Sequence, residues 1–200
     1  MEEVTIRRGR PEDAQDFAEL AFFTAPEYLE EVFGPDAKYI LKSLFERPNN
    51  IFSFQYSHFM EVGGEVAGMT LFYDDDEKKR GLAPFVLLLI KYLKFKFLAH
   101  LPSLLKFGSI FAQTREGDLY SSNTALYPKF RGRGLGERLF GLSEEAARKR
   151  GLKRIVVDVK ADNKEAIGLR KKLGYKVENI LPVLKIKGKT FEYLQLVKCI

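Results

Sequence analysis

The stretch Tyr127-Pro-Lys-Phe-Arg-Gly-Arg-Gly-Leu-Gly-Glu-Arg-Leu-Phe140 combines three closely spaced glycines with arginines and runs into an apolar stripe. Leu135, Leu139 and Leu142 recur at intervals of four and three residues, which predicts one buried helix face. Residues 119–126 before the stretch are typical of a strand. A glycine-rich turn between strand and helix leaves backbone N–H groups open to an anion. We therefore predict a phosphate-binding loop, the alternative being a plain turn with solvent-facing arginines.

The spacing of the glycines separates this loop from two common nucleotide-binding motifs. A P-loop requires Gly-Lys-Ser/Thr after a four-residue gap, and no such sequence is present. The dinucleotide fingerprint requires Gly-x-Gly-x-x-Gly. Counted from Gly132 the sixth position is Glu137, and counted from Gly134 it is Leu139. Neither motif accounts for the loop.

Two segments match the signatures of one family. Arg131-Gly-Arg-Gly-Leu-Gly136 has the form Arg/Gln-x-x-Gly-x-Gly/Ala. Asn163-Lys-Glu-Ala-Ile-Gly-Leu-Arg-Lys-Lys-Leu-Gly-Tyr175 is close to Asn-x-x-Ala-x-x-Leu-Tyr-x-Lys-x-Gly-Phe. In both, the sequence resembles the GNAT superfamily of N-acetyltransferases, over residues 126–175. The resemblance implies an α/β (α+β) fold with a mixed, mostly antiparallel central sheet, flanked by helices and splayed at a cofactor slot.

The resemblance also implies an acyltransferase that moves an acetyl group from acetyl-CoA to a primary amine, of a small molecule or a protein, by direct attack. Backbone amides of the glycine loop would hold the pyrophosphate, and the strand end would pair with the pantetheine arm. The side-chain amide of Asn163 would contact the cofactor, and an ordinary helix N-cap is a compatible second role. The implied cofactor-binding residues are Ala125, Leu126, Arg131, Gly132, Arg133, Gly134, Leu135, Gly136, Glu137 and Asn163.

The catalytic residues stay unknown at this level. The family pattern expects a tyrosine after Leu169 as proton donor, and this chain has Arg170. Arginine cannot donate a proton at neutral pH, although its charge could stabilise a thiolate or a cofactor phosphate. The strand before the loop carries Ser121, Ser122 and Asn123 where relatives place a carboxylate. A catalytically weak, acyl-CoA-binding regulatory module is therefore the alternative function.

The remaining periodicities predict the surrounding elements. Residues 4–7 form a strand, a helix runs from Pro11 to about Phe23, and a second helical segment follows Pro26, broken at Gly34-Pro35. Gly63-Gly64 joins two antiparallel strands. Further along, we expect a short buried strand at residues 155–157 and a helix at 162–173 that Gly174 ends. The chain should finish in a hairpin of two strands, 175–184 and 190–198, with its turn at 187–189.

Residues 75–115 are interpreted as a helical insertion within a single domain spanning 1–200. We expect two helices, divided near His100-Leu-Pro102, that bury apolar side chains on the domain or on a second subunit as a homodimer. The uncharged run 81–90 is about half of the roughly 20 residues that a bilayer requires, which argues against a span; an interfacial helix is the alternative. The acidic run 74–76 is interpreted as a solvated turn rather than an amine attractant.

Composition sets broad limits on the class of protein. A hydrophobic share of 46% and a charged share of 30% in 200 residues are typical of a globular domain. The single cysteine and the start Met1-Glu2-Glu3, without basic or apolar leader, predict a cytoplasmic protein. Residues 127–176 hold 15 Lys and Arg against 6 Asp and Glu. Basic and aromatic residues do not interleave on a strand, so no nucleic acid is expected, and the lone His58 and His100 suggest no metal.

Overall fold

The fold is built on one large mixed sheet. The computed structural model describes residues 2–110, 113–186 and 188–200. Within these residues a seven-stranded sheet has the order β1-β2-β3-β4-β5-β9-β6. Neighbouring strands are antiparallel except for the parallel pair of β4 and β5. The strands are β1 (Val4–Arg8), β2 (Ser57–Val62), β3 (Glu65–Asp74), β4 (Asp118–Leu126), β5 (Arg154–Lys160), β6 (Lys176–Ile180) and β9 (Tyr193–Cys199), with a small hairpin of β7 (Leu184–Ile186) and β8 (Lys189–Phe191).

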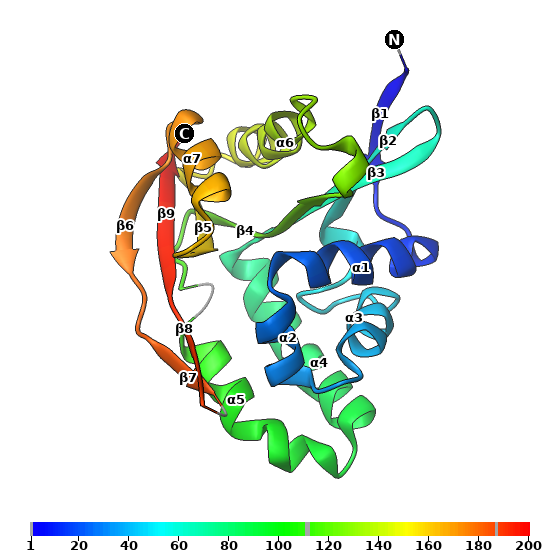
Figure 1. Cartoon of the computed structure of the whole chain (residues 1–200), viewed down its shortest axis with the longest axis vertical. Coiled ribbons are helices and arrows are strands. Elements are labelled where there is room, and N and C mark those ends of the chain that lie inside the picture. The colour runs from blue at the N-terminus through cyan, green and yellow to red at the C-terminus, as the bar shows by residue number, and fades with distance from the viewer. Residues whose placement is uncertain (1, 111–112, 187) are drawn as a thin grey trace.

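Helices cover both faces of this sheet, as Figure 1 shows. On β4 and β5, Leu119 and Ile155 pack in a cluster with α6, whereas Tyr120 and Val156 pack in the cluster that holds α1 to α4. This alternation is the two-residue period of a strand buried on both sides. The mixed, mostly antiparallel sheet flanked by helices is thereby confirmed. The helices are α1 (Ala14–Thr24), α2 (Pro26–Phe33), α3 (Ala37–Phe45), α4 (Asp75–Leu93), α5 (Lys96–Ile110), α6 (Leu135–Lys149) and α7 (Lys164–Lys172).

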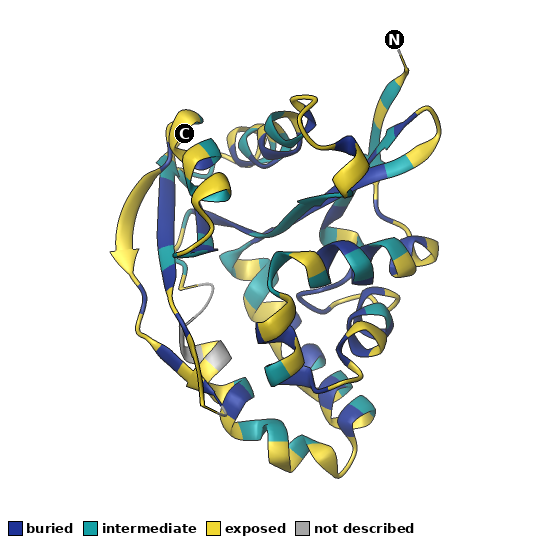
Figure 2. Cartoon of the chain, in the orientation of Figure 1, coloured by how far each residue is buried: buried dark blue, intermediate teal, exposed yellow. Residues whose placement is uncertain are grey.

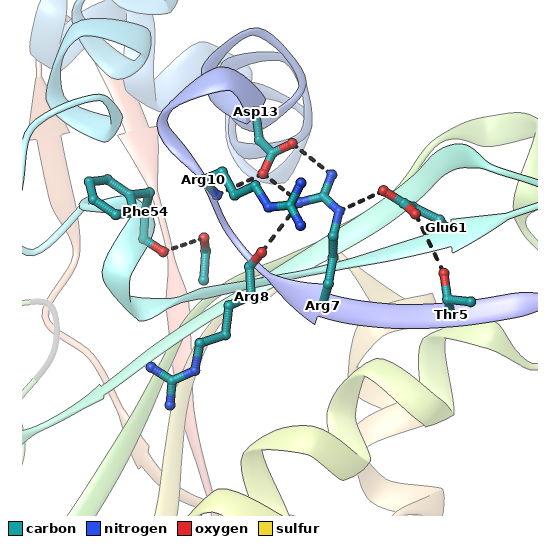
Figure 3. A network of polar contacts seen from close by, with 8 residues as sticks. Thr5, Arg7, Arg8, Arg10, Asp13, Phe54 and Glu61 are labelled. Carbon is teal, nitrogen blue, oxygen red and sulfur yellow. Dashed lines mark hydrogen bonds and ion pairs between the residues drawn. The ribbon is translucent and has the colours of Figure 1, made fainter.

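Burial follows the same layers. The central strands are largely buried, and β6, at the sheet edge, is exposed along its whole length (Figure 2). At the opposite edge, a charged network fastens the first two strands to the start of α1 (Figure 3). The guanidinium of Arg7 donates to both carboxylate oxygens of Asp13, at 2.7 and 2.8 Å, and to Oε1 of Glu61 at 2.6 Å. Asp13 also accepts the backbone N–H of Arg10, so the network positions the first helix.

The inserted helices are divided at a different place from the one predicted. Helix α4 ends at Leu93, and α5 begins at Lys96 and continues through Pro102. The division near His100-Leu-Pro102 is therefore wrong. A proline removes a single backbone donor, and here the helix continues around it. The chain instead reverses at Lys94, whose φ of 51° is in the left-handed region.

The acidic run also has a role that the sequence interpretation missed. Asp74 is the N-cap of α4: its carboxylate accepts the N–H of Glu77 at 2.8 Å, and the Glu77 carboxylate accepts the N–H of Asp74 at 2.9 Å. Asp75 and Asp76 occupy the first turn, where acidic groups favour the helix dipole. The solvated-turn interpretation is therefore wrong.

The other predicted elements are present with small changes. The break at Gly34-Pro35 separates α2 from α3, and Asn163 caps α7. Each of the two predicted C-terminal strands is divided in two: the first gives β6 and β7, and the second gives β8 and β9. Lys187, in the predicted turn, lies outside the described residues, while Ile186 pairs with Lys189 beside it. Among the described residues, no helix combines the length and the apolar character needed to cross a membrane.

Candidate functional site

The two parallel strands at the centre of the sheet diverge. Backbone pairing between β4 and β5 covers three positions and ends at Tyr120 and Val156. Beyond this point β4 continues to Leu126 and β5 to Lys160, and no strand formed by the described residues lies between them. The edge of β4 that faces this gap therefore lacks a strand partner. The predicted splay of the sheet is confirmed, and it leaves a slot between the two strands.

A β-bulge lies at the same level on the other edge of β4. Leu71 pairs with Asn123 and Phe72 with Ser121, which leaves Ser122 as an extra residue. A bulge bends the strand and re-aims its neighbouring groups, and bulges are common beside active sites. The Ser122 hydroxyl contacts Oδ1 of Asn123 at 2.9 Å, and the Asn123 amide donates to Oγ1 of Thr24 in α1 at 3.0 Å. The bulge thus directs polar side chains toward the helical layer.

The slot opens into a cavity of about 870 Å³. One part of the cavity follows the separated strands and the starts of α6 and α7, where its walls include Thr124, Val159 and Leu169. The other part extends below the sheet, between the junction of α1 and α2 and the inserted helices α4 and α5. The slot is therefore continuous with a chamber below the sheet.

The glycine loop lies at the mouth of the slot, where β4 gives way to α6. Gly132 and Gly134 have φ values of 75° and 73°, a left-handed conformation that glycine adopts without strain. Gly134 is the N-cap of α6, so the first N–H groups of that helix lie immediately after it. A Cβ on Gly136 would lie 3.6 Å from Leu169 and 3.8 Å from Leu126, which are ordinary packing distances. At Gly132 and Gly134 the left-handed backbone, rather than crowding, requires glycine, since a Cβ there would meet nothing within 4 Å.

A polar cluster lines the chamber where the strands separate. Asp158 on β5 accepts a 2.9 Å hydrogen bond from the hydroxyl of Tyr120 on β4 and a 3.3 Å bond from the amide of Gln195 on β9. Burial raises the pKa of the nearby Tyr73, whose hydroxyl stays protonated. Asp158 therefore provides a carboxylate at the point where β4 and β5 separate. The sequence does carry a signal for this residue, since Asp158 is a charged residue within the apolar strand Ile155-Val-Val-Asp-Val159. The sequence pattern by itself does not indicate that Asp158 contacts Tyr120.

Comparison with known proteins decides the family. The model of the Acetyltransferase (GNAT) family matches residues 14–175. The chain belongs to this family. The solved structures similar to this GNAT chain include an N-acetyltransferase from Staphylococcus aureus Mu50, 18% identical, with 97% of this chain and 100% of that one covered and a TM-score of 0.72.

Two further structures of similar fold contain the coenzyme. A Bacillus subtilis acetyltransferase in complex with CoA is 13% identical, with 100% and 99% coverage and a TM-score of 0.56. The protein yncA from Salmonella typhimurium, with its cofactor acetyl-CoA, is 17% identical, with 98% and 93% coverage and a TM-score of 0.58. At these identities the similarity concerns the fold. No curated protein matches the sequence of this chain.

Half of the predicted cofactor residues of this GNAT chain line the cavity. They are Ala125, Leu126, Arg131, Gly136 and Asn163. The Oδ1 of Asn163 accepts the N–H of Ala166 at 3.0 Å, which confirms its N-cap role. Arg131 reaches back to the carbonyl of Leu126 at 3.4 Å.

The other half lie beside the cavity, around the same loop. Arg133 pairs with Glu2 at 3.2 Å and lies over the ring of Phe130. The remaining members are Gly132 and Gly134 in the turn, Leu135 in the core, and Glu137, which pairs with Lys172 at 2.7 Å.

Arg170, which departs from the GNAT pattern, is buried beside the slot. It is 5% exposed, lines the cavity, and stacks its guanidinium 3.7 Å from the ring centroid of Phe140 in α6. Among the described residues, its buried Nη1 has no hydrogen-bond partner. Burial lowers the pKa of this guanidinium, and Tyr175 and Glu144 partly oppose the effect. An uncompensated buried donor of this kind is costly unless a ligand satisfies it.

Proposed function

We propose that the protein transfers the acetyl group of acetyl-CoA to a primary amine by direct attack of the amine. The observation that carries the proposal is the slot between β4 and β5, which begins at the glycine loop and ends at the polar cluster around Asp158. A donor that lies in this slot presents its reactive end to the chamber. Acetyl-CoA supplies an activated acetyl thioester there.

The residues at the mouth of the slot fit the phosphate end of the donor. The N–H groups that follow Gly134 and the positive end of the α6 dipole would hold the pyrophosphate, with Arg131 and Arg133 adding positive charge. The open edge of β4 at Ala125 and Leu126 would pair with the amide groups of the pantetheine arm, as an extended peptide pairs with a sheet edge. Asn163 would contact the arm from the opposite side of the slot.

The chain's own groups divide the chemical work at the inner end. The amine must lose a proton, and Asp158, held by Tyr120, would accept it. Backbone N–H groups near the Ser122 bulge would stabilise the oxygen of the attacked carbonyl. As the N–C bond forms, the C–S bond breaks and a thiolate leaves. Arg170 would stabilise the thiolate by charge, because a guanidinium cannot donate its proton at neutral pH.

A second candidate is a catalytically weak acyl-CoA-binding regulatory module. It is favoured by Arg170 in place of the tyrosine and by Ser122 and Asn123 where the resemblance expects a carboxylate. The two candidates share donor binding and differ in turnover. The expected cytoplasmic location, the single domain and the homodimer through α4 and α5 stay predictions.

Two measurements test the proposal and separate these candidates. Calorimetry with CoA should give saturable binding, and thiol release from acetyl-CoA should depend on added amine and yield an acetylated product by mass spectrometry. Binding without amine-dependent thiol release across a broad panel would support the regulatory module. The absence of CoA binding would overturn both candidates.

A further inference from the structure

The chamber on the acceptor side has a mainly apolar wall formed by the inserted helices. From α4 it receives Leu82, Phe85 and Val86, and from α5 it receives Leu101, Leu104 and Leu105. The facing wall, from the end of α1 and from α2, is also largely apolar. Much of the volume that an acceptor would fill is therefore bounded by hydrocarbon.

Polar groups are concentrated at the sheet end of this chamber. Lys78 lies in the first turns of α4 and lines the cavity; burial lowers its pKa, while the carboxylates of Asp75 and Asp158 act in the opposite direction. Leu82 and Phe85 follow it on the same face of α4, one and two turns further from the sheet. The chamber thus changes from polar, beside Asp158, to apolar, between the two helices.

From this gradient we propose that the acceptor is a lipophilic primary amine, a small molecule with its amino group at Asp158 and an aliphatic or aromatic group between α4 and α5. The inference rests on the proposed acetyl transfer and specifies its substrate class. Each methylene buried in such a chamber raises the affinity about fourfold. A polyamine or an aminoglycoside would lose water from groups that this wall cannot hydrogen-bond, and its extra positive charges would lie near Lys78.

A small molecule fits better than a peptide because the far end of the chamber is braced by other elements. Lys106 of α5 donates to the carbonyl of Lys185 in β7 at 3.2 Å, and Phe191 of β8 packs edge-on against Tyr28 of α2 with ring centroids 5.5 Å apart. Figure 1 shows the β7–β8 hairpin beside α5 at this end. A peptide chain would need an extended open groove through this region.

The first experiment compares acceptors in the thiol-release assay. Linear amines from ethylamine to hexylamine, together with 2-phenylethylamine, are tested against spermidine and against short peptides with a free N-terminus. We expect kcat/KM to rise about fourfold with each methylene until the chamber is filled. Spermidine and the peptides should fall at least 100-fold below hexylamine. A flat alkylamine series, or a preference for spermidine or for the peptides, overturns the substrate class while leaving acetyl transfer intact.

Calorimetry separates failure of this inference from failure of the proposed function. Hexylamine and ethylamine are titrated into the protein saturated with CoA. Tight hexylamine binding without any transfer would support the acceptor class and count against catalysis. Equal binding of hexylamine and ethylamine would overturn the inference, whatever the assay for transfer shows.

Matched substitutions locate the acceptor. Val86→Gln and Leu101→Gln place an amide in the chamber, whereas Leu87→Gln and Leu98→Gln place it on the outer faces of the same helices, where these leucines are 67% and 74% exposed. We expect the inner pair to lower kcat/KM for hexylamine about 10-fold with little change for ethylamine. The outer pair should match the wild type, and all four should bind CoA equally. Equal losses from inner and outer substitutions contradict the proposal.

Discussion

The hydroxyl of Tyr120, at the last paired position of β4, donates a 2.9 Å hydrogen bond to Oδ2 of Asp158, which lies on β5 beyond the last pair. The bond joins the two strands where they separate, on the face that carries the proposed acceptor chamber. It fixes the carboxylate at the inner end of the slot. In the proposed reaction this is where the donor's thioester and the acceptor's amine meet.

Removing the charge at this point should slow the proposed transfer. Asp158→Asn is isosteric and removes the proton acceptor, so we expect kcat to fall about 100-fold. Tyr120→Phe removes the group that orients the carboxylate, and its loss should be nearer about 10-fold. Steady-state thiol release measures both. CoA affinity by calorimetry is the control: a matching loss of CoA binding would mean that the slot itself had been disturbed.

Gly68 should control donor binding from the far side of β4. A Cβ at this position would lie 2.4 Å from the carbonyl oxygen of Ala125 and 2.5 Å from Cδ2 of Leu126. Gly68→Ala should therefore displace the strand end and weaken CoA binding, by about 10-fold or more. Gly141→Ala in α6 is the matched control, because a Cβ there meets nothing within 4 Å. Calorimetry of both variants tests this, and an unchanged affinity for Gly68→Ala would contradict it.

Arg170 should lower the pKa of the bound coenzyme's thiol. With its buried Nη1 unsatisfied by described residues, the guanidinium favours a thiolate over a neutral thiol. Ultraviolet absorbance of the thiolate, titrated with pH on the CoA complex, measures this pKa directly. Arg170→Met should return it toward the value of free CoA, and Arg170→Lys should retain part of the shift. A large gain of turnover in Arg170→Tyr would instead support a weakened catalytic site.

The network around Arg7 should contribute to stability rather than activity. Its bidentate contact with Asp13 is largely shielded from solvent and holds β1 against the start of α1. Asp13→Ala leaves the guanidinium without its main partner, so we expect the free energy of unfolding to fall by about 2 to 3 kcal/mol. Glu2→Gln breaks the exposed pair with Arg133 and should change it by no more than about 0.5 kcal/mol. Urea unfolding at pH 7 measures the free energy of unfolding of both variants and of the wild type.

His58 should make the protein less stable in mild acid. Burial lowers its pKa to about 4, and the positive charges of Arg8 and Arg150 act in the same direction. The unfolded chain binds the proton near pH 6.5, so stability is lost as the pH falls from there through 4, by on the order of 2 kcal/mol. Urea unfolding of His58→Gln at pH 7 and pH 5 should show a smaller difference than wild type. An equal difference between the two pH values in wild type and in His58→Gln would contradict this prediction.

The sequence alone determined the features that depend on neighbouring residues. The glycine turn, the helix stripe of Leu135 and Leu139, and the Asn163 cap are local, since backbone conformation and helix period follow from a few consecutive residues. Two such signatures at the right separation identified the family, and the family implied the splayed sheet.

Only the tertiary structure decided the features that depend on residues far apart in the chain. The extra residue at Ser122 exists only relative to β3, and Asp158 meets Tyr120 across 38 positions through strand pairing. The division of the inserted helices at Lys94 likewise could not be predicted, because proline is a stronger local signal than a lysine with positive φ. Local backbone preferences are encoded residue by residue, whereas register, bulges and the shape of the cavity arise when distant segments pack together.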